Sequence, residues 1–216
     1  MKDKAIVLLS GGLDSSTALF IAKKLHKCHC LIFDYGQKHI RELNSAVKIA
    51  KLAGCDYKII KMCFPWKGSS LTDDGLNIPY HPRKKIGKSV PDTYVPGRNT
   101  IFISYAVSFA EAIGAKKIYI GANAVDFSGY PDCSPQYYAA FNNLLKFGTK
   151  RGDIKIEIPL IKKTKKEIVN LAFKYSVPLK YTWSCYRGGD VPCGHCDSCV
   201  LRQEGFSAAG KKDPLL

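Results

Sequence analysis

The chain has 216 residues, a formal net charge of +15 and a hydrophobic content of 46%. This length suits one large α/β domain, or one domain with a small appendage, and it allows a buried core without disulfide bonds. No stretch approaches the roughly 18 uncharged apolar residues of a membrane-spanning helix, which excludes an integral membrane protein. The N-terminus leads directly into an apolar run without room for a secretory signal, so we expect a cytoplasmic location.

The basic charge suits a polyanionic ligand such as ATP or a nucleic acid, because it raises the local concentration of anions. The Lys and Arg residues are spread along the chain, however, and are dense only at 83–88 and at 162–166. An exposed and solvated surface explains most of them, since charge runs of this kind usually lie on exposed faces. We therefore expect ATP, and not a nucleic acid, as the partner.

The first part of the chain alternates between strand and helix patterns. An apolar run at 4–9 predicts a strand buried on both faces, as in a parallel sheet. Apolar residues at helical spacing follow at 15–25. A second strand is expected at 28–34, a second helix at 40–53 and a third strand at 57–61.

The alternation is interrupted at 62–98, a segment rich in Gly, Pro and Lys that predicts an insertion or a functional lid. Beyond it, helices are expected at 99–113, 135–147 and 165–175, with strands at 117–121 and 154–158. Capping signals mark two of these helices. Ser134 precedes a proline in the first turn, and Thr164 and Glu167 have the spacing of a capping box.

Strand and helix thus alternate about five times, which predicts an α/β fold. We expect a doubly wound, mainly parallel five-stranded sheet with helices on both faces. Residues 1–181 would form an ATP-binding α/β domain that carries the insertion at 62–98. The cysteine-rich remainder, 182–216, is expected to form a small C-terminal zinc-binding module.

The segment between the first strand and the first helix is suited to binding phosphate. Two adjacent glycines let several backbone N–H groups turn towards one anion, and the following helix adds the positive end of its dipole. Open α/β sheets also bind their ligands here, beyond the carboxyl ends of the strands. The predicted ATP-binding residues are Leu9, Ser10, Gly11, Gly12, Leu13, Asp14, Ser15, Ser16, Thr17, Ala18 and Leu19.

Asp14 needs its own explanation, because a carboxylate repels phosphate. It is expected either to bind Mg²⁺ that bridges to the ATP phosphates, or to hold the loop through backbone N–H groups. An ordinary helix cap also explains Asp and Ser at such positions. The combination of a strand, a Gly pair, several hydroxyl groups and a helix favours the phosphate site.

Four of the nine cysteines have the spacing of a metal site. Cys185, Cys193, Cys196 and Cys199 give Cys-x7-Cys-x2-Cys-x2-Cys, in which the short spacings bring three thiolates round one ion. Cys185 can complete a tetrahedron, and four thiolates without a water position predict one structural Zn²⁺. An iron–sulfur cluster is the alternative, because similar cysteine runs bind one.

The loop Ser10-Gly11-Gly12-Leu13-Asp14-Ser15 resembles the pyrophosphatase loop of the N-type ATP pyrophosphatases. Further motifs narrow this resemblance to the 7-cyano-7-deazaguanine synthase family, and it spans residues 4–206. These motifs are Asp34-Tyr35-Gly36-Gln37-Lys38-His39, Val95-Pro96-Gly97-Arg98-Asn99, Gly121-Ala122-Asn123 with Asp126, Ser128-Gly129-Tyr130-Pro131-Asp132-Cys133, and the cysteine-rich tail from Thr182 to Arg202.

The resemblance implies an ATP-dependent ligase that forms a C–N bond and yields a nitrile. Members of the family convert 7-carboxy-7-deazaguanine, ammonia and ATP into 7-cyano-7-deazaguanine (preQ0), in queuosine-precursor biosynthesis. They use Mg²⁺ with ATP and commonly form homodimers. Because the conversion removes two oxygens, we expect activation first of the carboxylate and then of the amide oxygen.

Residue chemistry suggests further roles. Arg98, the second candidate catalytic residue with Asp14, would neutralise the substrate carboxylate or a phosphate, because its planar fork suits either. Asp126 or Asp132 would accept hydrogen bonds from the donor edge of the deazaguanine, although loop Asp residues also cap turns. The candidate substrate-binding residues are Arg98, Asn99, Asp126, Tyr130 and Asp132. Whether Cys133 or His39 takes part in the chemistry stays open.

Two other functions would each suit one feature of the sequence. A tRNA-modifying ATP pyrophosphatase, such as a thiolase or a lysidine-type ligase, would suit the basic charge, but no appended RNA-binding domain accompanies the phosphate loop. A zinc-ribbon nucleic-acid-binding module would explain the cysteines, but it does not account for a five-stranded sheet with a phosphate loop.

Overall fold

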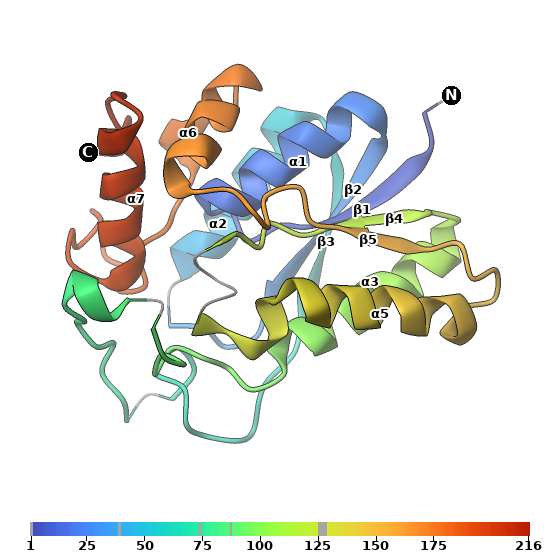
Figure 1. The fold of residues 1–216 in the computed structure, drawn as a ribbon, viewed down its shortest axis with the longest axis horizontal. Coiled ribbons are helices and arrows are strands. Elements are labelled where there is room, and N and C mark those ends of the chain that lie inside the picture. The colour runs from blue at the N-terminus through green and yellow to red at the C-terminus, as the bar shows by residue number, and fades with distance from the viewer. Residues whose placement is uncertain (1, 39, 74, 87, 125–128) are drawn as a thin grey trace.

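The computed structural model describes residues 2–38, 40–73, 75–86, 88–124 and 129–216. Its centre is a five-stranded sheet in the order β3-β2-β1-β4-β5, in which every neighbouring pair is parallel (Figure 1). The strands are β1 (Lys4–Leu8), β2 (Lys27–Asp34), β3 (Asp56–Lys61), β4 (Lys117–Tyr119) and β5 (Lys155–Glu157). The predicted fold class is confirmed.

Helices cover both faces of the sheet. Within the described ranges they are α1 (Leu13–Leu25), α2 (Ile40–Ala53), α3 (Arg98–Ile113), α5 (Pro135–Gly148), α6 (Lys165–Lys174) and α7 (Asp197–Ala208). Buried residues of α1, α2 and α6 form one hydrophobic cluster with one face of the strands, and those of α3 and α5 form a second cluster with the other face. Among the described residues, no helix has the length and apolar character to cross a membrane.

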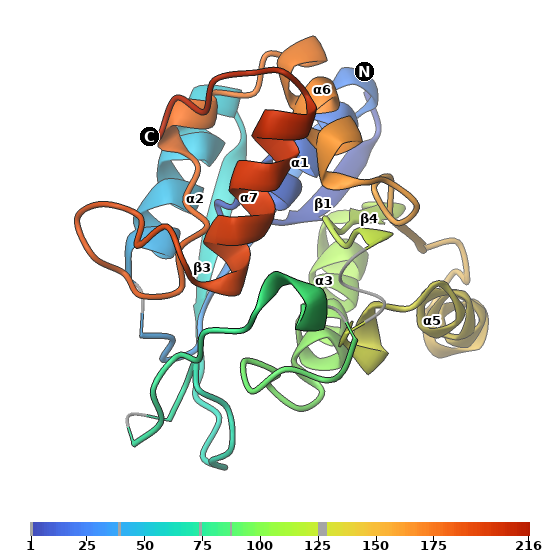
Figure 2. The same ribbon diagram turned by 60° about the vertical axis from the view of Figure 1, so that its left-hand side comes forward.

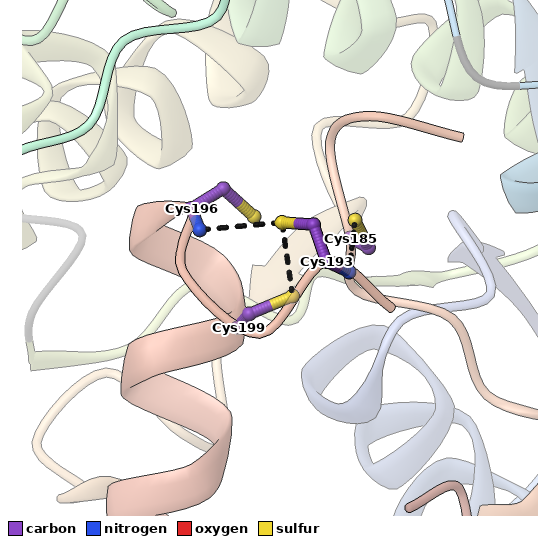
Figure 3. A group of neighbouring side chains, drawn as sticks. All are labelled: Cys185, Cys193, Cys196 and Cys199. Atoms are coloured by element: carbon purple, nitrogen blue, oxygen red, sulfur yellow. Dashed lines mark hydrogen bonds between the residues drawn. The ribbon is translucent and has the colours of Figure 1, made fainter. Parts of the chain in front are cut away.

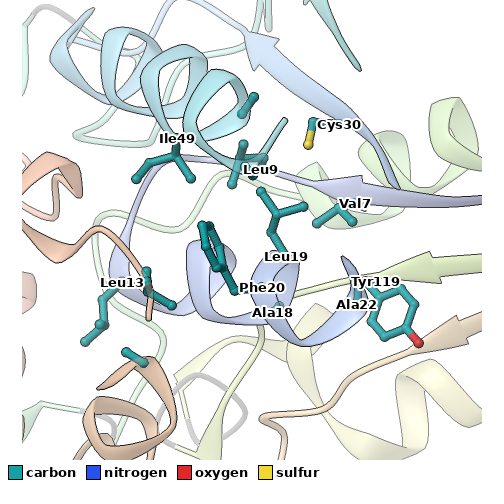
Figure 4. Packing of buried hydrophobic residues seen from close by; sticks show 14 of the residues in the cluster. Val7, Leu9, Leu13, Ala18, Leu19, Phe20, Ala22, Cys30, Ile49 and Tyr119 are labelled. Carbon is teal, nitrogen blue, oxygen red and sulfur yellow. The ribbon is translucent and has the colours of Figure 1, made fainter. Parts of the chain in front are cut away.

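The two clusters follow from alternation along the buried strands, since successive side chains of a strand point to opposite faces. Ala5 and Val7 of β1 join the cluster of α1 and α2, whereas Ile6 joins that of α3 and α5. Figure 4 shows Val7 in one layer with Leu19 of α1 and Ile49 of α2. Both faces of β1 are therefore apolar, and its buried residues Ala5, Ile6 and Val7 form a continuous hydrophobic run.

The predicted caps are present. The Ser134 hydroxyl accepts a hydrogen bond from the Tyr137 N–H at the start of α5, and Thr164 and Glu167 form a reciprocal capping box at the start of α6. Helix α1 begins two residues earlier than expected, at Leu13, so the phosphate-loop candidates from this residue onward lie inside the helix.

Two regions interrupt the alternation of strand and helix, as the sequence predicts. Before α3 begins at Arg98, the described residues of segment 62–98 hold only one short 3₁₀ helix, Arg83–Lys85, yet Leu71 and Val95 are buried in the α3 and α5 cluster. The C-terminal segment holds α7, which the sequence did not predict. Phe206 of α7 lies in the cluster of α1 and α6, so this segment packs on the larger part of the molecule. The domain boundary at 181/182 stays a prediction.

Candidate functional site

A pocket of about 260 Å³ opens beyond the carboxyl ends of β1, β2 and β4. Its walls come from the loop after β1, the ends of β2 and β4, the first turns of α2 and α3, and the C-terminal segment. The residues that line it include Leu9, Ser10, Gly12, Leu13, Asp14, Ser15, Phe33, Tyr35, Glu42, Leu71, Arg98, Asn99, Phe102, Gly121, Tyr130, Cys133, Trp183, Ser184, Tyr186 and Ser198.

Two glycines let backbone segments approach each other closely at this pocket. Gly11 has φ +83°, and a Cβ there would lie 2.4 Å from the Ala46 nitrogen of α2. A Cβ on Gly121, which follows β4, would lie 2.7 Å from the Ser15 Cα of α1. Separations this short are not tolerated, so both positions require glycine. The loop after β1 is thus clamped between α2 and the end of β4.

The hydroxyl groups of the loop fall into two sets. Ser10 Oγ and Ser15 Oγ lie 2.9 Å apart, and the Gly12 N–H donates to Ser10 Oγ at 3.4 Å. Both serines line the pocket. The Thr17 hydroxyl instead donates to the Leu13 carbonyl at 2.7 Å inside α1, and Ser16 is fully buried. Only the first set faces the space where a phosphate could bind.

Six of the predicted ATP-binding residues line the pocket: Leu9, Ser10, Gly12, Leu13, Asp14 and Ser15. The other five do not line it among the described residues. Gly11 turns away beneath the loop, and Ser16, Thr17, Ala18 and Leu19 are buried in α1 against the sheet. Direct contact of these five with a nucleotide stays a prediction that the geometry does not favour.

Asp14 belongs to a small charged network in the pocket. Its Oδ2 accepts hydrogen bonds from Lys165 Nζ at 2.5 Å and from Asn123 Nδ2 at 3.1 Å. Both side chains of the ion pair are largely buried, with 15% of Lys165 and 22% of Asp14 exposed. Asp14 Oδ1 is buried without a hydrogen-bond partner among the described residues. One carboxylate oxygen is therefore neutralised, and the other stays available to a cation or a donor.

Arg98 lies at another wall of the pocket, at the first position of α3. Its Nη1 donates to the Tyr35 hydroxyl at 3.1 Å, and its guanidinium lies 5.6 Å from the Tyr35 ring centre and 6.0 Å from that of Phe102. Burial acts against its charge, but Tyr35, Tyr130 and Glu42 nearby favour it, and the pKa of Arg98 is raised above its usual value. A permanent cation thus faces the pocket from an aromatic wall.

The Asp132 carboxylate is committed to the backbone. Its Oδ2 accepts from the Asn99 N–H at 3.1 Å, and Asn99 Nδ2 donates to the Asp132 carbonyl at 3.2 Å. Burial raises the pKa of Asp132, against the opposing effects of the Asn99 N–H and of Arg98. Asp132 is not among the described residues that line the pocket, whereas Asn99, Tyr130 and Cys133 line it. A substrate-reading role for Asp132 stays a prediction.

Two of the sequence candidates, Asp126 and His39, lie outside the described residues. Tyr130 lies at the pocket and is hydrogen-bonded at 3.0 Å, hydroxyl to hydroxyl, with Thr93 of the 62–98 segment.

The four C-terminal cysteines come together as predicted. Figure 3 shows Cys185, Cys193, Cys196 and Cys199 converging, and their sulfur atoms all lie within 4.8 Å of one another. A tetrahedron with Zn–S bonds of about 2.3 Å has sulfur–sulfur edges of roughly 3.8 Å. Cys193 Sγ and Cys199 Sγ are 4.0 Å apart. The group therefore fits a tetrahedral metal ion such as zinc.

Backbone amides surround these sulfurs. The N–H groups of Arg187 and Cys193 donate to Cys185 Sγ, each at 3.4 Å, and the Cys196 N–H donates to Cys193 Sγ at 3.4 Å. Donors of this kind stabilise thiolate charge and orient the ligands of a metal ion. The environment suits four thiolates that bind one metal ion.

A family model described as "Queuosine biosynthesis protein QueC" matches residues 4–210 of the chain. The chain belongs to the QueC family. Its relatives include proteins named 7-cyano-7-deazaguanine synthase. The one from Thermoplasma acidophilum is 48% identical over 99% of this chain and 92% of its own length, and the one from Nostoc punctiforme is 48% identical over 99% of both chains. The QueC protein described here is thus an enzyme of queuosine biosynthesis.

One solved structure resembles the fold of the chain at lower identity. The NMN synthetase from Francisella tularensis is 16% identical and superposes with a TM-score of 0.55, over 98% of this chain and 78% of that one. At this identity the likeness concerns the fold alone. It agrees with the α/β architecture of the chain.

Sequence reasoning missed several residues of the QueC pocket. Lys165, the partner of Asp14, was noted only as the first residue of a capped helix. Tyr35 is hydrogen-bonded to Arg98, and the Trp183 N–H donates to the Gly11 carbonyl of the phosphate loop. The capping box at 164–167 carries a usable signal for Lys165, because it places this residue in the first turn of a helix. Nothing local in the sequence signals that Trp183 contacts Gly11.

Proposed function

We propose that this QueC protein converts 7-carboxy-7-deazaguanine and ammonia into 7-cyano-7-deazaguanine at the expense of ATP. Family membership and the names of the relatives support the overall conversion. The observation that carries the site assignment is a single pocket lined both by the phosphate loop with Asp14, whose carboxylate pairs with Lys165, and by the aromatic wall with Arg98. An anionic nucleotide and an anionic planar acid could therefore meet there.

The ATP phosphates would bind at the loop after β1. Hydrogen-bond donors there are the backbone N–H groups around Gly12 and the hydroxyls of Ser10 and Ser15. The positive end of the α1 dipole adds a favourable potential for an anion. Asp14 would hold Mg²⁺ through its unpartnered oxygen, while Lys165 stays beside the phosphates. The charge of Asp14 is then offset by two cations, so that a carboxylate can remain in an anion site.

The chemistry needs two activation events, since two oxygens leave the carboxyl carbon. In the first, a carboxylate oxygen attacks the α-phosphorus of ATP and pyrophosphate leaves. Ammonia then adds to the acyl carbon, and AMP departs with one oxygen to give the amide. In the second, the amide oxygen attacks the α-phosphorus of another ATP and pyrophosphate leaves, and loss of AMP and of both nitrogen-bound protons then gives the nitrile. The protein would contribute orientation and charge stabilisation by Arg98, Lys165 and the loop.

The metal at the four cysteines would be a structural Zn²⁺, because its four thiolates leave no position for a reacting group. Cysteines that bind a metal ion and form no disulfide bonds are typical of a reducing compartment, which favours a cytoplasmic enzyme. A homodimer is proposed on the family resemblance alone.

The decisive experiment is incubation of the zinc-loaded protein with Mg-ATP, ammonium and 7-carboxy-7-deazaguanine, with products analysed by mass spectrometry. We expect the amide to appear before the nitrile, together with AMP and pyrophosphate. A preparation with Asp14→Ala serves as the inactive control. If the folded, zinc-loaded protein forms neither amide nor nitrile, the proposed reaction is wrong. If ADP and phosphate accompany the nitrile, the α-phosphate attack is wrong and the conversion stands.

A further inference from the structure

We propose that metal binding at the four cysteines positions the nucleotide pocket, through Trp183 and through an arm formed by residues 76–83. This rests on the proposed function, because it assumes a zinc ion at the cysteines and ATP at the loop. The zinc-binding segment is then part of the pocket wall, and His81 of the arm is a positioning residue.

The first link joins the cysteine segment directly to the phosphate loop. The Trp183 N–H donates to the Gly11 carbonyl at 2.9 Å. The Trp183 side chain is buried, and its indole N–H donates at 2.9 Å to the carbonyl of Cys185, the first of the four cysteines. A Cβ on Gly12 would lie 3.5 Å from the Trp183 carbonyl, so the two backbones are in close contact. The position of Cys185 thereby fixes Trp183, and the Trp183 backbone in turn supports the phosphate loop at Gly11 and Gly12.

The second link is the pocket wall itself. Ser184 and Tyr186, which flank Cys185, both line the pocket, as does Ser198 between Cys196 and Cys199. Residues 185–196 contain no helix or strand, so backbone hydrogen bonds of regular structure do not hold this wall in place. A metal ion that joins four points along residues 185–199 would supply the missing restraint, because binding of a structural zinc is itself folding free energy.

The third link is the arm, which lies beside the N-terminal end of α7 (Figure 2). Ile78 packs in the cluster of Trp183 and the cysteines, and its carbonyl accepts from Arg187 Nη2 at 3.4 Å. His81 Nδ1 lies 2.8 Å from Asp197 Oδ2, and Arg83 Nε donates to Glu204 at 2.6 Å. Ile78, His81 and Arg83 thus join the arm to the cysteine segment and to α7, and His81 Nε2 also lies 4.0 Å from Asp92 Oδ2.

The chain just before the arm reaches the pocket. Leu71 is buried and lines the pocket, and its carbonyl accepts from the Lys38 N–H at 3.1 Å. Lys38 Nζ donates to the Leu76 carbonyl at 2.5 Å, where the arm begins. The arm is thus attached to the pocket at Leu71 and to the cysteine segment at Ile78 and His81. Loss of the metal should release both the wall and the arm.

Limited trypsin digestion tests this directly, because Arg83, Lys84 and Lys85 are exposed at the end of the arm. We expect chelation of the metal to raise the cleavage rate at these three residues about tenfold, which corresponds to a release of about 1.4 kcal/mol. ATP binding, followed by equilibrium dialysis, should weaken in parallel, and added Zn²⁺ should restore both. Unchanged cleavage and unchanged ATP binding in metal-free protein would overturn the proposal.

The variant His81→Ala separates the arm from global unfolding, because it leaves all four cysteines in place. With zinc content confirmed, cleavage at 83–85 should rise, and KM for ATP should rise while kcat is unchanged. His26→Ala, far from the arm at the end of α1, is the matched control and should behave as the parent protein. Parent-like cleavage and KM in His81→Ala would show that the arm does not position the pocket.

The outcome is independent of the nitrile-forming reaction. Zinc-dependent protection of the arm together with absent nitrile formation would reject the proposed function and support the coupling. Nitrile formation at full rate in metal-free protein would reject the coupling and support the proposed function.

Discussion

A carboxylate and an ammonium group share one site at the phosphate loop. Asp14 would be unfavourable beside phosphates if it stood alone, but Lys165 already pairs with it at 2.5 Å. Pairing at partly buried positions is stronger than at the surface, because less water screens it. The same lysine can turn its charge to an incoming phosphate, since an ammonium group has three donors.

This arrangement predicts that Lys165→Met impairs ATP use. Removal of the ammonium leaves the Asp14 charge uncompensated beside the phosphates, so kcat/KM for ATP should fall by about a hundredfold or more, as for loss of one charge-stabilising group. Steady-state kinetics with ATP as the varied substrate would measure it. Lys166→Met is the control, because Lys166 is the exposed neighbour in the same turn. Equal losses in both variants would show that Lys165 has no special role.

Arg98 should act on the acid substrate and not on ATP. Arg98→Lys keeps the charge but loses the planar fork and the geometry of the hydrogen bond to Tyr35. We expect KM for 7-carboxy-7-deazaguanine to rise about tenfold or more, the cost of a weakened charge-assisted hydrogen bond. KM for ATP should stay unchanged. A rise in KM for ATP alone would place Arg98 at a phosphate instead, and Arg151→Lys, at an exposed surface position, provides the control.

At the scale of elements, the capping box of α6 predicts a defined pH dependence. The Thr164 N–H, then Lys163 and the Thr164 hydroxyl, lower the pKa of Glu167 to about 2. A carboxyl whose pKa is lower in the folded state stabilises the fold above its unfolded pKa, and this contribution is lost as pH falls through the folded pKa. Its window therefore runs from the ordinary Glu value, about 4.3, down to about 2.

Glu167→Gln should accordingly be less stable than the parent protein at pH 7, and the difference should shrink as pH falls below about 4.3. Urea unfolding at a series of pH values would give the difference. Gln can keep the hydrogen bond to the Thr164 N–H, so the variant isolates the charge. A difference that does not change with pH would contradict the assignment.

Most elements could be predicted because their signals are local. Continuous apolar runs marked the buried parallel strands, and helical spacing with caps marked α2, α5 and α6. Helix α7 gave no such signal, since its buried positions include Cys199 and Arg202 as well as Phe206. Those side chains serve the metal group and an internal ion pair, so the helix lacks a plain apolar stripe.

The residues of the candidate site also fall into two groups, those with a local signal in the sequence and those without one. The glycines and serines of the loop and the four cysteines are close in sequence, and their spacing alone indicated their chemistry. Lys165 and Trp183 come from elements more than 150 residues away from the loop that they contact. Their roles follow from the topology of the sheet and from the path of the C-terminal segment, and no periodicity in the sequence encodes either.

At the scale of the molecule, an internal ion pair fastens the C-terminal segment. Arg202 of α7 donates to both Asp213 carboxylate oxygens, through Nε at 2.6 Å and Nη2 at 2.9 Å. The two side chains are 5% and 4% exposed. Arg202 also donates to the Thr182 hydroxyl at 2.8 Å, which is next to Trp183 at the pocket. One buried guanidinium thus joins α7, the tail and the chain that leads into the pocket wall.

Arg202→Met should therefore destabilise the whole molecule, because it leaves Asp213 as an uncompensated buried charge. Loss of one partner of such a pair costs about 3–5 kcal/mol of unfolding free energy. The double variant Arg202→Met with Asp213→Leu should recover much of this, since an apolar pair of similar volume removes the unpaired charge. Urea unfolding at saturating zinc would measure all three proteins. The exposed pair of Arg151 and Asp153 supplies the control, because Arg151→Met should change stability by less than about 0.5 kcal/mol. If Arg202→Met costs no more than this control, the pair does not fasten the segment, and the stability of the C-terminal part must come from its packing on α6 and from the metal.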